Sequence, residues 1–249
     1  MPIKNGDFIK ITYTGRLENG DFFDTTDEKT AKEVNIFNES AEYGAKMIVV
    51  GSEHVLKGLD EDVDGRDVGY EGSVTIQPEK GFGDRDPTLV ETAMVSKFDK
   101  KPYPGMRVTI SGRMGIVETV IGRRARVDFN HPLAGETLTY EYVIEKKLSS
   151  TKAKIKGLIN LYVTSDIDVE IQGDVATVII PYALSFDQRW LMSKQRIANE
   201  VLTHTNIREV WYLEKYVSPK VEKKAKKDKK VKEDKKVKKS GKSRQEEGQ

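Results

Sequence analysis

Two alternating segments far apart in the chain constrain the fold more than any other feature of the sequence. Apolar and polar residues alternate from Asp7 to Arg16 and again from Leu138 to Glu145. Strict alternation predicts strands with one buried face. We therefore expect one sheet that opens near the N-terminus and is completed only after residue 138, which implies an insertion between its elements.

Short elements are expected between these two strands. Glu18-Asn19-Gly20-Asp21 is a turn signal that makes the first strand and Asp21–Asp24 a hairpin. The elements that follow are a loop over Thr25–Ala45, a buried strand over Met47–Val50 ended by Gly51, a short helix carrying Val55, Leu56, Leu59 and Val63 on one face, and a strand over Gly72–Pro78.

The insertion has its own strand pattern. After Pro87, three strand candidates joined by glycine-containing turns form a β meander; they are Met106–Ser111, Gly115–Ile121 and Arg124–Phe129. A further unit starts near Thr151. It contains a hairpin with its turn at Gln172-Gly173-Asp174, a helix opened by a capping box of Ser185 and Gln188, and a last strand, Ile207–Tyr216.

The chain ends in a basic tail. From Lys220 to Gln249 there are 14 basic and 6 acidic residues, so the tail has a net charge of +8. Because the net charge of the whole chain is +2, the residues before the tail have a net charge of −6. The tail offers almost nothing to bury, which predicts disorder in isolation. It is either a solubilising tail or an attachment to RNA, ribosomes or another polyanion; no aromatic residue interrupts the lysines to support base stacking.

These patterns predict an α+β protein in four parts. An antiparallel sheet wrapped on a short helix spans residues 1–86 and 129–150, the inserted small β domain spans 87–128, a C-terminal α+β domain spans 151–218, and the tail spans 219–249. The C-terminal domain shows no site chemistry, and its apolar-faced hairpin and helix could mediate a homodimer.

The usual signatures of catalysis are missing. The chain has no cysteine, and His54, His131 and His204 form no metal-binding spacing, so we expect no metal and no cofactor. No phosphate-binding or nucleophile-elbow motif occurs. No run of ~20 apolar residues and no signal sequence is present, so we expect a cytoplasmic protein without membrane contact.

One reaction needs none of these groups. Rotation about a prolyl amide bond is resisted by resonance, with a barrier of ~18–20 kcal/mol. The planar amide is more dipolar than the twisted one, so an apolar, water-excluding pocket favours the transition state relatively. Aromatic and aliphatic walls with one or two polar groups are enough.

Several ordered motifs resemble the FKBP-type peptidyl-prolyl isomerases. They are Tyr13-Thr14-Gly15, Asn19–Thr25, Val55-Leu56-Lys57-Gly58-Leu59 and Pro78–Gly83. Asn130–Gly135 with Leu138-Thr139-Tyr140 is similar to the SlyD-like branch, in which an insert-in-flap domain interrupts the catalytic domain, and residues 151–217 resemble the C-terminal unit of long archaeal members. Residues 3–148 carry most of the resemblance.

The resemblance implies a pocket and the roles of its residues. Asp24 is implied to lie near the substrate carbonyl, and the main-chain N–H of Leu56 is implied to hold the peptide. The remaining residues implied to form the walls and rim are Tyr13, Phe23, Val55, Leu59, Phe82, His131, Leu133 and Tyr140. From its alternation with Tyr140, we expect Tyr142 to be part of the core.

Three residues depart from the family pattern. Leu59 stands where tryptophan is often the pocket floor, which predicts weak macrolide affinity. Phe82 replaces a tyrosine and so lacks a hydroxyl, and Lys46 and Met47 stand where an aromatic wall is expected. The histidine-rich tail of some SlyD proteins is replaced by lysines, so nickel binding does not follow.

For the insert, the resemblance implies a chaperone surface that holds unfolded or nascent chains with X-Pro bonds. An exposed, adaptable apolar groove suits that task, and methionine is adaptable. The candidate residues, with Met94 and Phe98 one helical turn apart, are Met94, Val95, Phe98, Tyr103, Met106 and Ile116. Most of them could equally form the small core of the insert.

The sequence thus predicts a prolyl isomerase with holding chaperone activity. Two alternatives stay open. One is a binding module whose catalysis is vestigial, and the other is a polyanion-associated factor that acts through Lys220–Lys239.

Overall fold

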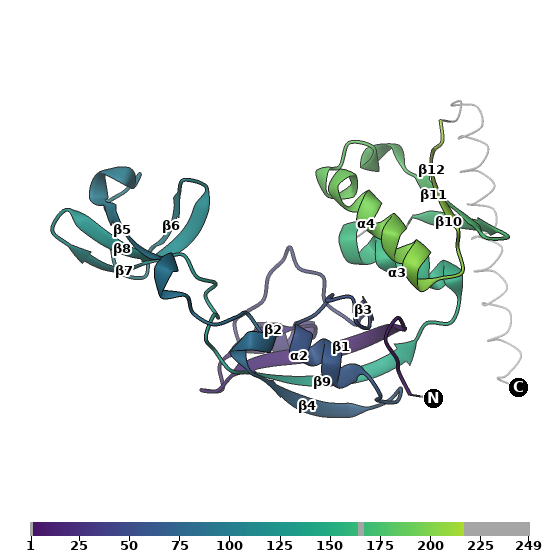
Figure 1. Ribbon diagram of the computed structural model, residues 1–249, viewed down its shortest axis with the longest axis horizontal. Coiled ribbons are helices and arrows are strands. Elements are labelled where there is room, and N and C mark those ends of the chain that lie inside the picture. Colours follow the sequence, from purple (N-terminus) through teal and green to yellow (C-terminus); the bar gives the residue numbers. More distant parts are fainter. Residues whose placement is uncertain (1, 164–166, 217–249) are drawn as a thin grey trace, which may run out of the picture. The chain divides into compact units, whose positions relative to one another are not determined.

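The structure is a computed structural model that describes residues 2–163 and 167–216 (Figure 1). These residues divide between Leu161 and Tyr162 into two compact units, which are described separately. The predicted boundaries of the four sequence segments are not tested by this division and stay a prediction.

The first unit contains a five-stranded antiparallel sheet. Its strands are β1 (Phe8–Leu17), β2 (Phe22–Thr25), β3 (Lys46–Val49), β4 (Glu71–Ile76) and β9 (Leu138–Lys147). The order is β2-β1-β9-β4, and β3 also pairs with β1. β1 pairs with β9 along nearly its whole length, for example Tyr13 opposite Tyr142. The sheet is therefore completed only after the insertion, as the two alternating segments predict.

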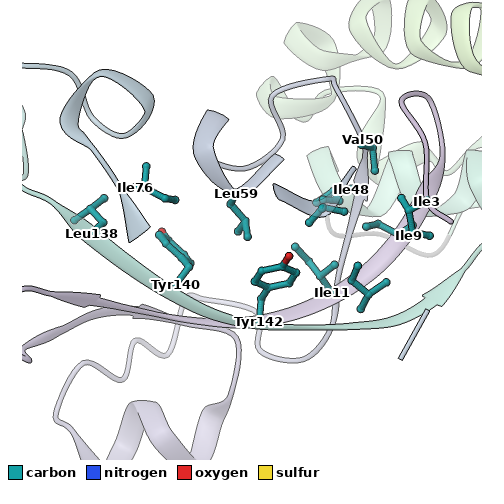
Figure 2. Packing of buried hydrophobic residues seen from close by; sticks show 12 residues of the cluster. Ile3, Ile9, Ile11, Ile48, Val50, Leu59, Ile76, Leu138, Tyr140 and Tyr142 are labelled. Atoms are coloured by element: carbon teal, nitrogen blue, oxygen red, sulfur yellow. The ribbon is translucent and has the colours of Figure 1, made fainter. Parts of the chain in front are cut away.

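Helix α2 (Lys57–Val63) packs on this sheet and buries Leu59 completely. A Cβ at Gly58 would lie 2.7 Å from the Ile76 side chain of β4, so only glycine allows this close approach. Figure 2 shows Tyr140 and Tyr142 rising from one face of β9 toward Leu59. The core cluster is Ile3, Ile9, Ile11, Ile48, Val50, Leu59, Val63, Ile76, Leu138, Tyr140, Tyr142 and Ile144.

The loop expected over Thr25–Ala45 is wrong in part, because it contains helix α1 (Glu28–Glu33). Asp27 caps this helix by accepting a hydrogen bond from the Thr30 N–H at 3.0 Å. Ala31 is the only residue of α1 that is buried. With one buried position, the helix has no apolar stripe that a sequence pattern could show. The apolar pattern therefore indicates a loop, although Asp27 is a good helix cap.

The insertion forms a four-stranded antiparallel sheet of order β5-β8-β7-β6. Its strands are β5 (Val90–Met94), β6 (Arg107–Ile110), β7 (Arg113–Ile121) and β8 (Arg124–Asp128). Three of them are predicted by the sequence; β5 is not, because none of its five residues is buried. The helical turn expected between Met94 and Phe98 is a single 3-10 turn, η3 (Val95–Lys97). Two further 3-10 turns, η1 (Pro78–Lys80) and η2 (Pro87–Leu89), precede the insertion's sheet.

The second unit is a small α+β arrangement. Helix α3 (Thr151–Val163), which the sequence did not indicate, crosses the division between the units. The other elements are β10 (Asp168–Gln172), β11 (Val175–Ile180), η4 (Tyr182–Leu184), α4 (Gln188–His204) and β12 (Glu209–Glu214). The predicted hairpin pairs β10 with β11, and β12 lies parallel to β11.

The predicted capping box at the start of α4 is wrong. Asp187 is the N-cap and accepts a hydrogen bond from the Trp190 N–H at 3.0 Å, whereas Ser185 ends the 3-10 turn η4. Asp187, two residues after Ser185, is the better cap because the positive end of the helix dipole also stabilises its negative carboxylate. Among residues 2–163 and 167–216, no helix has the length and apolarity needed to span a membrane.

Candidate active site

Five aromatic rings from separate parts of the first unit meet at one end of its sheet. The Tyr13 and Tyr140 ring centroids lie 5.4 Å apart, and those of Phe23 and Tyr140 lie 5.6 Å apart, both edge to face. Phe82 lies 6.4 Å from Phe23, and His131 stacks on Phe82 at 4.1 Å. Such contacts fix ring orientation more strictly than aliphatic packing does. We call these five residues the aromatic cluster.

Backbone geometry explains how strand pairing brings the rings together. Gly15 of β1 lies opposite Asp24 of β2 and opposite Tyr140 of β9. The Phe23 ring lies directly over Gly15, and a Cβ there would be 2.7 Å from the ring. The glycine of the Tyr13-Thr14-Gly15 motif is therefore required because it leaves room for the Phe23 ring.

Helix α2 and the segment before it add aliphatic groups beside the rings. Val55 and Leu56 are half-buried and pack against the same core as Phe23 and Phe82. Leu56 is the N-cap of α2, so its own N–H is not needed for a helical hydrogen bond. Leu59 is fully buried beneath them.

Tyr142 does not join the aromatic cluster. It is buried, and its hydroxyl donates a hydrogen bond to Asp62 of α2. The expectation that Tyr142 belongs to the core is confirmed.

Asp24 is a carboxylate that interacts with the aromatic cluster, through a hydrogen bond with Tyr13 and through its charge at Tyr140. Burial raises its pKa, while a hydrogen bond donated by the Tyr13 hydroxyl, an amide hydrogen bond at Thr25 and the charge of Lys46 oppose that rise. Burial also raises the pKa of Tyr13, and the Asp24 charge raises it further. The pair is therefore a partly desolvated carboxylate held by a phenol that stays protonated.

Tyr140 carries a second phenol into the same environment. The side chain is 4% exposed, and burial, together with the charge of Asp24, raises the pKa of its hydroxyl. A neutral hydroxyl in this position can donate a hydrogen bond to a carbonyl oxygen. No proton shuttle is available from it, because it stays protonated across the physiological range.

The segment expected to lack an aromatic wall places its two residues differently. The positive charge of Lys46 favours the ionised form of Asp24 and so opposes the rise of its pKa. Met47 is buried and points at α3, where a Cβ on Gly157 would be 3.0 Å from its side chain. The lysine therefore contributes charge at the site, and the methionine contributes to the core.

The loop after the insertion forms the rim. His131 is exposed, and its Nδ1 accepts a hydrogen bond from the Leu133 N–H at 3.1 Å. Leu133 itself is half-buried. The structure thus brings His131 onto the aromatic cluster through Phe82, and fixes Leu133 beside it through the backbone.

A separate apolar groove of about 640 Å³ lies on the insertion. It is lined by Leu89, Arg107, Val108, Thr109, Arg113, Met114, Gly115, Ile116, Phe129, Asn130, His131 and Pro132. Of the six residues that the sequence analysis assigned to a chaperone surface, only Ile116 lines it. Phe98 and Met106 pack against the core of the insertion, and Val95 is half-buried in η3.

Met94 and Tyr103 are exposed but lie away from the groove, with 45% and 63% of their surface accessible. Met114, which no sequence pattern indicated as a surface residue, is 81% exposed and lines the groove. The strand expected from the sequence begins at Gly115, so Met114 lies outside it, whereas β7 already begins at Arg113. Within the described ranges, no group of three or more His, Asp or Glu side chains is arranged to hold a metal ion.

The fold and the site together define a class. A short helix lies across an antiparallel sheet beside a cluster of aromatic rings, and one desolvated carboxylate lies at the edge of that cluster. This is the arrangement of an FKBP-type catalytic domain, here interrupted by an inserted β domain and followed by an α+β domain.

Comparisons with known proteins agree with this class. The family model for the FKBP-type peptidyl-prolyl cis-trans isomerase matches residues 1–99, that for the FKBP26 IF domain matches 92–133, and that for the FKBP26 C-terminal region matches 151–217. A "Short-type peptidyl-prolyl cis-trans isomerase" of Methanocaldococcus jannaschii is 37% identical over 141 residues, covering 55% of this chain and 89% of the relative.

Two SlyD proteins are also similar. That of Treponema pallidum is 32% identical over 130 residues, covering 50% of this chain and 74% of the relative. That of Aeromonas hydrophila is 32% identical over 116 residues, covering 42% of this chain and 52% of the relative. The chain belongs to the FKBP-type peptidyl-prolyl cis-trans isomerases.

Proposed function

We propose that the chain couples prolyl isomerisation at the aromatic cluster to holding of unfolded or nascent polypeptides on the insertion. The observation that carries the proposal is the apolar groove, which reaches the rim of the site. His131 lines the groove and also stacks on Phe82 of the aromatic cluster. A chain held in the groove is thereby kept near the catalytic residues.

At the aromatic cluster, the proposed mechanism is desolvation of the prolyl amide. Tyr13, Phe23 and Phe82 are half-buried and so present ring surface to a ligand, above buried Tyr140 and Leu59. Contact with these groups removes water from the amide. This desolvation raises the free energy of the dipolar planar form more than that of the twisted form. Rotation about the C–N bond needs no nucleophile and no proton transfer.

Polar groups then orient the peptide. In this proposal the N–H of Leu56, the N-cap residue of α2, holds a carbonyl of the substrate, and Asp24, which is hydrogen-bonded by Tyr13, acts on the prolyl amide. A carboxylate with a raised pKa is poorly solvated, so it interacts more strongly with a nearby dipole than a surface carboxylate does. Asp24 is proposed to favour the carbonyl orientation of the twisted amide in this way.

The groove fits polypeptides that lack a fixed structure. Its walls combine a flexible methionine, Met114, with Val108, Ile116 and Phe129. An adaptable apolar surface accepts many different side chains with modest affinity. A client held in the groove keeps its prolines close to the catalytic residues. Their effective concentration there rises without any additional contact at the aromatic cluster.

Met114→Gln tests the groove. It should weaken suppression of client aggregation and slow proline-limited refolding of a protein by about three- to tenfold, because a polar amide replaces the apolar wall. Isomerisation of a short peptide should stay unchanged. Ile121→Gln is the matched control, since Ile121 is 79% exposed, nearly as much as Met114, but does not line the groove.

Equal effects of Met114→Gln and Ile121→Gln would contradict the assignment of the groove. The converse variant, Asp24→Leu with Tyr13→Ala, should lose acceleration of refolding and still suppress aggregation. If it accelerates refolding as well as the parent, the aromatic cluster is not the catalytic site. Location in the cytoplasm and homodimer formation through residues 151–218 stay predictions.

A further inference from the structure

Charge is distributed unevenly between the insertion and its host. Residues 1–86 and 129–150 contain 12 basic and 22 acidic residues, whereas residues 87–128 contain 8 basic and 4 acidic ones. A basic domain is thus inserted into a strongly acidic one.

Most of the basic side chains of the insertion have no acidic partner. Arg113 pairs with Glu91 and Arg126 with Glu118, and Arg107 lines the groove. The five that are left are exposed and form no ion pair with any residue in the described part of the chain; they are Lys97, Lys100, Lys101, Arg123 and Arg124.

Strand register and one backbone hydrogen bond place three of these residues, Lys97, Arg123 and Arg124, at one end of the small sheet. Val90 lies opposite Asp128 where the chain enters and leaves the insertion, and Met94 lies opposite Arg124 at the other end. There the Val95 N–H donates to the Arg123 carbonyl at 3.0 Å, which brings the turn η3 and its Lys97 against the hairpin.

Lys100 and Lys101 follow on the loop that leads from η3 to β6. We call the five residues the cationic end. Asp99 is the one acidic residue within this stretch of residues 95–101 and 121–124.

Exposed apolar and aromatic side chains accompany the cationic end. Tyr103, on the same loop, is 63% exposed, and Ile121, next to the hairpin turn, is 79% exposed. An exposed aromatic ring beside several cations can stack on a base while the cations contact phosphates. An acidic polypeptide offers carboxylates to the cations but no base that could stack on the ring.

We propose that the cationic end binds the sugar-phosphate backbone of a nucleic acid. A nucleic acid carries one negative charge per nucleotide in an unbroken series, so several neighbouring cations each release a counterion on binding. The tail from Lys220 has the same sign, with 14 basic and 6 acidic residues.

The acidic host then has a defined effect. Its excess of carboxylates repels a polyanion, so the bound nucleic acid is kept away from the catalytic residues and these remain free for polypeptides. The inference therefore goes beyond the proposed function and does not depend on it.

The test uses the full chain and a fluorescent 20-nucleotide single-stranded RNA, with anisotropy measured at several salt concentrations. Lys97→Gln, Arg123→Gln and Arg124→Gln are combined in one variant. The control combines Lys4→Gln, Lys29→Gln and Lys146→Gln, three exposed residues of the acidic host, so that both variants lose the same net charge. Neither set lies in the aromatic cluster. Short-peptide isomerase activity verifies that the host is folded in both variants, and amide exchange protection in β7 and β8 verifies that the insertion is folded.

We expect the first variant to bind at least about tenfold more weakly near 0.1 M salt, and its plot of log K against log salt to be shallower by about 2, since three phosphate contacts are lost at ~0.7 each. The control should bind almost as the parent does. Equal binding by the two variants would overturn the proposal, as would affinity that does not change with salt. Tighter binding of polyglutamate than of RNA would also overturn it and would identify an acidic polypeptide as the partner.

Discussion

The isomerase module, residues 1–86 and 129–150, and the insertion differ most in the size of their cores. The isomerase module buries twelve residues in one cluster, whereas the cluster of the insertion contains Val117, Ala125 and Val127 alone. Both are antiparallel sheets, but in the isomerase module the sheet is covered by α2. No helix longer than the 3-10 turn η3 accompanies the sheet of the insertion in the described residues.

This difference teaches how two binding tasks can share one chain. The aromatic cluster needs rings held at fixed angles, and a large core supplies that rigidity. A groove for varied clients needs side chains that rearrange, and a core of three residues allows it. A domain of about forty residues is marginal by itself, so the insertion depends on its attachment to the host.

The largest expected effect tests the comparison of the two cores. Leu59→Ala should lower the free energy of unfolding by about 2–5 kcal/mol, because it opens a cavity under the aromatic cluster. Urea denaturation followed by far-UV circular dichroism measures this change in the free energy of unfolding. Val127→Ala should instead abolish amide exchange protection in β7 and β8 while protection in β1 and β9 persists.

A single cooperative loss of protection in all four strands after Val127→Ala would show that the two regions are one folding unit. The comparison of cores would then have no functional meaning. Retained protection in β7 and β8 would show that the insertion is more stable than its core implies.

A second prediction concerns the contacts that join the two regions. Arg85 precedes the insertion and donates hydrogen bonds to Asp128 from Nε at 3.0 Å and from an Nη at 2.7 Å; it also contacts Glu118. Asn130 accepts from the Asp86 N–H and donates to the Asp86 carbonyl, both at 2.9 Å. These contacts fix the two crossing segments beside each other, next to His131.

Arg85→Ala should therefore reduce kcat/KM for a protein substrate by about two- to fivefold and leave a short peptide unaffected, as exposed ion pairs have modest energies. Arg85→Lys should restore only part of it, because an ammonium group cannot make the bidentate contact. Refolding and peptide assays in parallel measure the ratio. Equal losses on both substrates would mean that Arg85 supports the fold rather than the coupling.

The smallest expected effect contrasts one carboxylate from each region. Burial raises the pKa of Asp24, so its ionised form costs stability, and that cost grows as pH rises through the raised pKa. At Asp128, burial is outweighed by hydrogen bonds from Asn130 and Arg85, and the pKa is lowered. Its stabilisation is present above the unfolded pKa and is lost as pH falls.

Asp24→Asn should accordingly become more stable relative to the parent as pH rises from 3 to 7, by less than about 1 kcal/mol because the group is partly solvated. Asp128→Asn should become less stable relative to the parent over the same range. Urea denaturation at several pH values measures both. Tyr13→Phe should shift the pH dependence that is due to Asp24 to higher pH, because it removes the hydrogen bond that lowers the pKa of Asp24. Parallel pH curves for the two Asn variants would contradict the opposite pKa shifts assigned to Asp24 and Asp128.

Particular elements show how far the sequence could be interpreted. Alternation identified β1 and β9 and hence the insertion, because burial of one face leaves a period of two in the side chains. It missed β5 and α1, in which zero and one residues are buried, and no periodicity arises from so few positions. The cap of α4 was misplaced by two residues because Ser185 and Asp187 are both good caps, and only the backbone decides between them.

By itself, the sequence determined which residues could form the site, because motifs such as Tyr13-Thr14-Gly15 and the helix glycine Gly58 are imposed by local packing and strand geometry. Only the tertiary structure decided which of them touch. The stacking of His131 on Phe82 and the groove around Met114 join residues that are far apart in the chain, and the pairing of Tyr13 with Asp24 joins the two strands of one hairpin. Contacts of that kind depend on strand register and on how closely the elements pack, and neither leaves a periodic trace in the order of the amino acids.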